Sequence, residues 1–190
     1  MGEPKIVVVD YHKGNLSSVV RGLARAGAAA CTSDDPEQIR NADGLVIPGV
    51  GAFYDAIAFM RQSGEAAAVL DAVAAGTPLL GICLGLQAAV CEFARNVAGL
   101  TGATSAEFDE NADHTVIDLM PEQQGITAKG GTMRLGKYPC VLSPESKAYE
   151  YYGEGLIYER HRHRYEVNND FREEIVARGL LPVGMSPDGS

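Results

Sequence analysis

Short apolar runs alternate with amphipathic segments along the first half of the chain. The run over residues 5–10 has consecutive apolar residues at positions 6–9, which is typical of a strand buried on both faces. Similar runs follow over residues 28–32, 44–48 and 79–83, and the segments between them have helical spacing. Alternating strands and helices predict a parallel sheet with helices on both faces, and therefore an α/β fold.

Capping residues predict where the helices of this half begin and end. Asn15 is expected to cap a helix that runs to Gly27, and Pro36 opens a short helix that ends near Ala42. The spacing of apolar residues predicts three more helices, over residues 52–62, 65–75 and 85–97.

The pattern changes after residue 100. Strand-like segments are separated by turns rich in glycine, proline and asparagine, and they cover residues 116–119, 132–135, 140–142 and 156–165. A short helix over 171–178 and a strand over 180–185 follow. Because no repeat, linker or low-complexity tract interrupts the chain, we expect residues 1–190 to form a single domain.

Composition excludes several classes of protein. The 190 residues are 46% hydrophobic, enough for a sizeable core, and the net charge of −9 argues against a nucleic-acid partner. The four cysteines have no paired spacing, so we expect neither a metal site nor a disulfide framework. The apolar stretch over 69–90 is interrupted by Asp71, Gly76 and Pro78, and the N-terminus has no signal peptide. We therefore expect a cytoplasmic protein without a membrane span.

The residues around Cys83 carry the clearest chemical signal. Residues 78–82 predict a buried strand that turns abruptly at Cys83 into a helix. Gly81 and Gly85 flank the cysteine two positions away on each side, which is the pattern of a nucleophile on a strained turn. N–H groups at a helix start stabilise a thiolate there. We predict that Cys83 is a nucleophile; a cysteine simply buried in an apolar strand is the alternative.

Residues 78–87 resemble the nucleophile segment of class I glutamine amidotransferases, whose cysteine attacks the side-chain amide of glutamine and releases ammonia. The resemblance extends to two different families. Residues 5–87 resemble the glutaminase subunit of imidazole glycerol phosphate synthase, in segments 8–11, 14–19 and 45–53. Residues 81–190 resemble the amidotransferase domain of CTP synthase, in segments 92–100, 105–109, 130–136 and 159–169. The chain therefore resembles a hybrid that changes family between residues 81 and 87.

The resemblance implies a three-layer α/β fold with a mostly parallel central sheet whose last strands are missing. It also implies an oxyanion hole made by the backbone N–H groups of Val50 and Leu84. At position 50 the CTP synthase pattern has glycine, so Val50 follows the other family. An ordinary turn from strand to helix is the alternative for this loop.

Glutamine is expected to contact two groups of residues, again by resemblance. The first surrounds the nucleophile and comprises Gly49, Leu84, Gly85, Leu86 and Gln87. The second is the pair Glu107 and Arg164, because one carboxylate and one guanidinium match the two charges of a free amino acid. Solvated surface charges are the alternative for this pair.

The basic segment over residues 160–164 has other interpretations. A His-x-His pair at His161 and His163 suggests a metal site, but no carboxylate or cysteine pattern accompanies it. A phosphate site conflicts with the acidic charge of the whole chain. We expect structural pairing, with Arg164 binding glutamine and no metal bound.

A catalytic base is the part of the pattern that we do not find. Both families place a histidine and a glutamate in a Gln-Phe-His-Pro-Glu type segment near the C-terminus, and residues 1–190 contain no such segment. None of the four histidines is followed two positions later by glutamate. We therefore expect a chain that ends before its base and hydrolyses glutamine poorly, with His161 or His163 as poor substitutes.

The predicted function is hydrolysis of L-glutamine through a cysteine thioester, with ammonia delivered for the amination of UTP to CTP. The alternatives are the glutaminase of imidazole glycerol phosphate synthase, in histidine biosynthesis, and a catalytically inactive glutamine-binding fragment. By resemblance, the domain needs no cofactor of its own. ATP and Mg²⁺ would belong to an absent synthetase domain, so an ammonia-accepting synthase domain or subunit is the expected partner.

Overall fold

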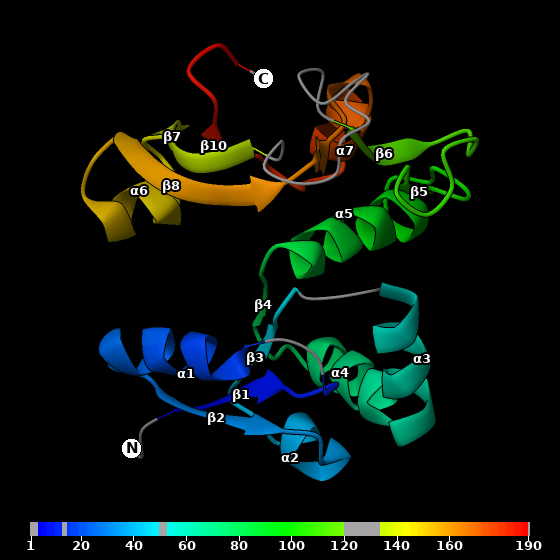
Figure 1. Cartoon of the computed structure of the whole chain (residues 1–190), viewed down its shortest axis with the longest axis vertical. Coiled ribbons are helices and arrows are strands. Elements are labelled where there is room, and N and C mark those ends of the chain that lie inside the picture. The colour runs from blue at the N-terminus through cyan, green and yellow to red at the C-terminus, as the bar shows by residue number, and fades with distance from the viewer. Residues whose placement is uncertain (1–3, 13–14, 50–52, 120–133, 190) are drawn as a thin grey trace. The chain divides into compact units, whose positions relative to one another are not determined.

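A computed structural model of the chain describes residues 4–12, 15–49, 53–119 and 134–189 (Figure 1). The chain divides into two compact units, Met1–Ala89 and Val90–Ser190, here called the N-terminal and the C-terminal unit. The boundary lies inside helix α5 (Leu84–Asn96). The single domain expected from the sequence stays a prediction.

The N-terminal unit contains a four-stranded parallel sheet with strand order β2-β1-β3-β4. Its strands are β1 (Lys5–Val9), β2 (Ala29–Ser33), β3 (Gly44–Ile47) and β4 (Leu79–Gly81). Its helices are α1 (Leu16–Arg25), α2 (Pro36–Arg40), α3 (Phe53–Ser63) and α4 (Glu65–Ala74). The predicted α/β fold with a parallel sheet is confirmed.

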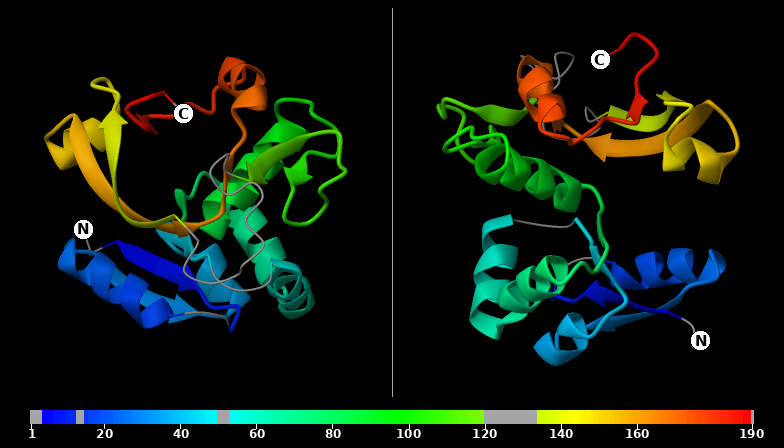
Figure 2. Two further views of the ribbon diagram at one scale, coloured as in Figure 1. Left: turned by 45° about the horizontal axis from the view of Figure 1, so that its top comes forward. Right: turned by 180° about the vertical axis from the view of Figure 1, so that it is seen from behind.

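Both faces of β1 are covered, as its unbroken apolar run predicted. Val7, Val8 and Val9 of β1 are all fully buried. Val7 and Val9 belong to a core cluster with residues of α2, α3 and α4, whereas α1 contacts β1 and β2. Figures 1 and 2 show α1 and α2 on opposite sides of the sheet. The apolar runs of this unit are therefore strands of a layered α/β sheet.

Strand β4 departs from the prediction of a buried strand. Leu79 and Leu80 are 41% and 50% exposed, because β4 is the last strand in the order and has a sheet neighbour on one side among the described residues. An apolar run fixes the tendency to form a strand, but the position of the strand in the sheet decides how much of it is covered.

The C-terminal unit contains two three-stranded sheets, β5-β6-β9 and β10-β7-β8, within its described part. The strands are β5 (Thr104–Ser105), β6 (Thr115–Leu119), β7 (Arg134–Leu142), β8 (Leu156–His163), β9 (Tyr165–Val167) and β10 (Gly184–Met185). Helices α6 (Lys147–Tyr152) and α7 (Arg172–Ala177) and a 3₁₀ helix (Asn169–Phe171) complete it. Its core gathers Val116 and Ile117 of β6 with Ala94 of α5 and Ile175 of α7.

Two predicted elements of this unit differ in extent. The strand predicted over 180–185 is limited to β10, and the one predicted over 156–165 is divided at Arg164, which lies between β8 and β9. Residues 132 and 133 of another predicted strand lie outside the described residues. No helix in the described ranges combines the length and the apolar character that a bilayer crossing requires.

Candidate active site

Cys83 occupies a turn between the end of β4 at Gly81 and the start of α5 at Leu84. Its backbone is left-handed, with φ of 55°, a conformation that costs a residue with a side chain about 1–3 kcal/mol. The Cys83 carbonyl accepts hydrogen bonds from the N–H groups of Leu86 (3.0 Å) and Gln87 (3.2 Å). The thiol is exposed. The structure therefore has the predicted strained turn from strand to helix.

Glycines let the loop after β3 lie directly against this turn. A Cβ atom at Gly49 would lie 2.2 Å from the Leu84 nitrogen and 2.3 Å from the Ile82 oxygen, and one at Gly85 would lie 2.5 Å from the Ile47 oxygen. These neighbours are backbone atoms, which have little freedom to move, so a larger residue does not fit. The first turn of α5 thus packs against the loop that continues toward Val50.

The predicted oxyanion hole is described for one of its two amides. Leu84 begins α5, and its nitrogen lies at the contact with Gly49. Val50 lies outside the described residues, so its amide stays a prediction. Leu86 and Gln87 follow in the first turn of α5, Leu86 exposed and Gln87 half-buried.

Tyr11 is a residue of this region that the sequence analysis missed. Its ring is 4% exposed, and its hydroxyl donates a hydrogen bond to the carbonyl of Pro48. Because Pro48 directly precedes Gly49, the bond anchors the start of the loop that touches the Cys83 turn. An aromatic residue between Asp10 and His12, immediately after a buried strand, was the signal available in the sequence.

His12 follows the carboxyl end of β1, at the same edge of the sheet as the Cys83 turn. Its Nδ1 is 3.8 Å from Asp10 Oδ1 and its Nε2 is 3.5 Å from Asp34 Oδ2. Asp34 follows β2, which lies on the opposite side of β1 from β3 and β4. The ring also packs edge-on against Phe59, with ring centroids 4.7 Å apart. Both ring nitrogens of His12 therefore lie near carboxylates.

Glu107 and Arg164, predicted to bind glutamine, lie at one end of the same sheet of the C-terminal unit. Glu107 follows β5 and Arg164 precedes β9. Strand β6 pairs in parallel with β5 and antiparallel with β9, with Leu119 opposite Tyr165. One end of this sheet therefore contains the carboxyl ends of β5 and β6 and the start of β9. Glu107 and Arg164 lie next to this end.

A cavity of about 380 Å³ lies at this end of the sheet. It is lined by residues 106–111 and Tyr165, and Glu107 is among them. Burial raises the pKa of Tyr165, Glu107 raises it further and Arg164 lowers it, so both predicted charges act on the same phenol. Glu107 thus lines the cavity, and Arg164 directly precedes Tyr165, another of its lining residues.

The basic strand β8 has a structural role in the antiparallel ladder. His163 pairs with Arg134 and His161 pairs with Gly136 of β7. Among the described residues there is no group of three or more His, Cys, Asp or Glu side chains with the arrangement of a metal site.

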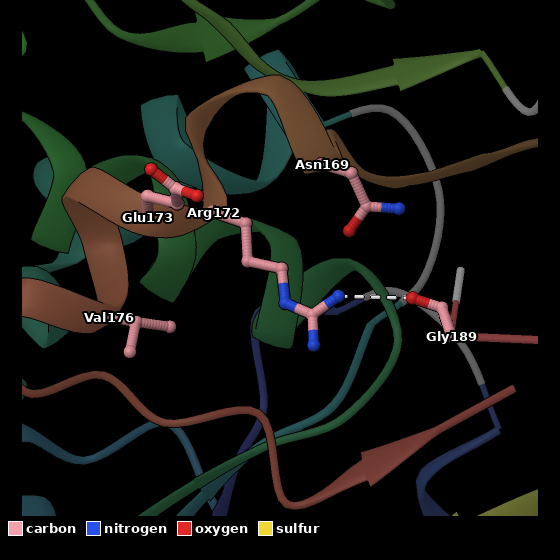
Figure 3. A pocket seen from close by; sticks show the side chains of 5 residues that line it. All are labelled: Asn169, Arg172, Glu173, Val176 and Gly189. Atoms are coloured by element: carbon pink, nitrogen blue, oxygen red, sulfur yellow. Dashed lines mark hydrogen bonds between the residues drawn. The ribbon is translucent and has the colours of Figure 1, made fainter.

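A second cavity of the C-terminal unit involves none of the predicted site residues. It has a volume of about 440 Å³ and is lined by Asn169, Arg172, Glu173, Val176 and Gly189 (Figure 3). The Arg172 guanidinium donates to the Gly189 carbonyl at 3.0 Å. This bond ties α7 to the turn at residue 189.

The sequence was compared with protein-family models and with proteins of known function. The model of the family "Glutamine amidotransferase class-I" matches residues 7–189. The chain belongs to the class-I glutamine amidotransferases. The CTP synthase of Caldanaerobacter subterraneus subsp. tengcongensis is 54% identical over 194 residues, covering 95% of this chain and 35% of that protein. That of Rubrobacter xylanophilus is 52% identical over 188 residues, covering 90% of this chain and 33% of that protein.

A solved structure has the same fold. The Trypanosoma brucei CTPS glutaminase domain with bound acivicin matches with a TM-score of 0.72 at 24% identity, covering 98% of this chain and 77% of that chain. The chain spans about a third of the length of these two CTP synthases. Because the first of those alignments covers 95% of the chain, the similarity includes the N-terminal part as well. The resemblance of residues 5–87 to the imidazole glycerol phosphate synthase glutaminase is distant.

Proposed function

We propose that the chain is the glutamine-hydrolysing part of a CTP synthase. The observation that carries this proposal is the 54% identity to a CTP synthase over 95% of the chain, together with the left-handed turn at Cys83. Amination of UTP with ATP and Mg²⁺ takes place in an ammonia-accepting synthase domain or subunit, and residues 1–190 hold no cofactor of their own. The proposed location is the cytoplasm.

Glutamine hydrolysis assigns a covalent step to Cys83. The thiolate sulfur attacks the side-chain amide carbon, and the carbonyl oxygen becomes an oxyanion that the N–H groups of Leu84 and Val50 stabilise. The C–N bond then breaks and ammonia leaves after taking up a proton. Water hydrolyses the thioester, which releases glutamate and restores the thiol. Exposure of Cys83 supports this role because substrate has to reach the sulfur.

Recognition of glutamine is assigned to two places in the chain. The side-chain amide is held by Gly49 and by the first turn of α5, over residues 84–87. The free amino group pairs with Glu107 and the free carboxylate pairs with Arg164. The convergence of these two charges on Tyr165 supports the second assignment.

Proton transfer is the step with the weakest candidates in residues 1–190. No histidine there is followed two positions later by glutamate, and His12 is turned toward Asp34. Loss of one member of a nucleophile–base unit costs on the order of 10³–10⁶ in rate. We therefore expect residues 1–190 alone to hydrolyse glutamine slowly, with His161 and His163 as the candidates for any residual activity.

An assay with alternative acceptors tests the proposal. Glutamate release is measured for residues 1–190 alone, with a CTP synthase synthetase domain plus UTP, ATP and Mg²⁺, and with a cyclase subunit of imidazole glycerol phosphate synthase. We expect stimulation and CTP formation in the second mixture, and none with Cys83→Ala. Stimulation by the cyclase subunit alone would favour the histidine pathway. Glutamine binding without turnover in every mixture would favour an inactive glutamine-binding domain.

A further inference from the structure

Glu65 is a buried carboxyl group that the proposed chemistry does not use. It lies in the first turn of α4 and is fully buried. Neither of its side-chain oxygens has a hydrogen-bond partner among the described residues. An ionised carboxylate in such a place is costly, because it loses its hydration and the nearby Ser63 hydroxyl offsets only part of that loss. The group is therefore expected to bind its proton more tightly in the folded chain than in the unfolded one.

Burial and several neighbouring groups act on the pKa of Glu65. Burial is the largest influence and raises the pKa of Glu65; Asp34 and Asp10 raise it further, while the Ser63 hydroxyl and His12 lower it. On the neighbouring helix α2, Arg40 is already engaged by Glu37 at 2.7 Å and by Asp71 of α4 at 2.9 Å.

The connection before Glu65 provides a hinge. Gly64 has φ of 87°, a left-handed conformation suited to glycine, and it gives α4 no side-chain cap. The Glu65 amide donates to the Ser63 hydroxyl at 3.4 Å, which is a long hydrogen bond. Gly64 is therefore the residue at which the backbone before α4 has the most conformational freedom.

We propose that Glu65 is a proton-dependent latch of the N-terminal unit. With a proton bound, the carboxyl stays buried and holds the first turn of α4 in place. When it ionises, the side chain moves to water about Gly64 and this turn loosens. The inference is independent of the proposed function, which assigns no role to any residue of α4.

The direction of the pH effect follows from the raised pKa. The folded state binds the Glu65 proton more tightly than the unfolded state does. The stabilisation is therefore complete below the ordinary pKa of a glutamate and is lost as the pH rises through the raised, folded-state pKa.

Amide hydrogen exchange of the full chain between pH 5 and 8 tests the latch. The Ala68 amide is the reporter, because it donates to the Gly64 carbonyl at 3.1 Å and so closes the first turn. After correction for intrinsic exchange, its protection in the wild type should fall by up to about tenfold per pH unit above the folded-state pKa. In Glu65→Gln, which keeps the shape but has no proton to lose, protection should stay constant.

Two further variants complete the experiment. Glu37→Gln removes an exposed carboxylate of α2 and should keep the slope of the wild type. Glu65→Leu fills the same site with an apolar group and should stay protected at pH 8. Equal slopes in the wild type and Glu65→Gln would overturn the proposal. So would protection that Glu65→Gln lowers equally at every pH, since this would indicate an ionised, paired carboxylate.

Discussion

Two cysteines eight residues apart have opposite surroundings. Cys83 is exposed, on a left-handed turn at the start of α5. Cys91, further along the same helix, is 6% exposed, and burial raises the pKa of its thiol to about 11, an effect that Arg95 only partly offsets. A thiol has to be ionised and accessible to act as a nucleophile. The position of a cysteine relative to the helix start therefore decides its chemistry.

Replacing each cysteine by alanine should have the most different effects on activity. In the assay with the synthetase domain, Cys83→Ala should lower kcat for glutamine hydrolysis by on the order of 10³–10⁶, because the covalent step is lost. Cys91→Ala should leave kcat within a few-fold of the wild type and cost about 1 kcal/mol of stability. Measured turnover and urea unfolding give both quantities. A large loss of kcat in Cys91→Ala with Cys83→Ala active would reverse the assignment.

The turn at Cys83 should be sensitive to one added methyl group in the loop beside it. Gly49→Ala places a Cβ atom 2.2 Å from the Leu84 nitrogen, and we expect it to cost about 3 kcal/mol or more in the free energy of unfolding.

Gly22→Ala is the matched control, because Gly22 lies in the interior of α1 with nothing within 4 Å of the added Cβ atom. It should stabilise the chain by about 0.5–1 kcal/mol through helix propensity. Urea unfolding followed by circular dichroism measures both changes. Equal effects of the two substitutions would show that the loop does not pack on the turn as described.

Glu107 and Arg164 of the C-terminal unit should affect the affinity for glutamine rather than the reactivity of the Cys83 thiol. Arg164→Ala should weaken glutamine binding by about 1.5–3 kcal/mol, because a charge-assisted hydrogen bond to the substrate carboxylate is lost. Arg160→Ala removes an exposed guanidinium from the same basic segment and serves as the control. Calorimetric titration with glutamine should distinguish them, and unchanged affinity in Arg164→Ala would remove this residue from the site.

Local signals in the sequence predicted the elements that depend on few neighbours. Asn15 caps α1 as expected, with its side chain accepting from the Ser18 N–H at 3.3 Å. The turn at Cys83 also follows from residues within two positions of it. The exposure of Leu79 and Leu80 could not be predicted from neighbouring residues, because it depends on the order of strands in the sheet.

Contacts between distant segments were beyond local reasoning. The bond from Tyr11 to Pro48 joins residues 37 positions apart, and no spacing rule predicts it. Glu107 and Arg164 were paired by family resemblance, and their common role in binding glutamine stays a prediction; both charges act on the pKa of Tyr165. Glu65 occupies a buried position of α4 where an apolar residue is the usual choice, so its burial could not be expected from the residue type.

Labelling of the four cysteines by an electrophilic glutamine analogue tests the central claim most directly, because it requires the nucleophile and the glutamine site but not complete turnover. At pH 8 a thiol with a pKa of about 11 is ionised to about one part in a thousand. Peptide mapping by mass spectrometry should show Cys83 modified at least about 100-fold faster than Cys91, and excess glutamine should slow only the Cys83 reaction. Equal rates at Cys31, Cys83, Cys91 and Cys140, with no protection by glutamine, would contradict the assignment of Cys83 as the nucleophile.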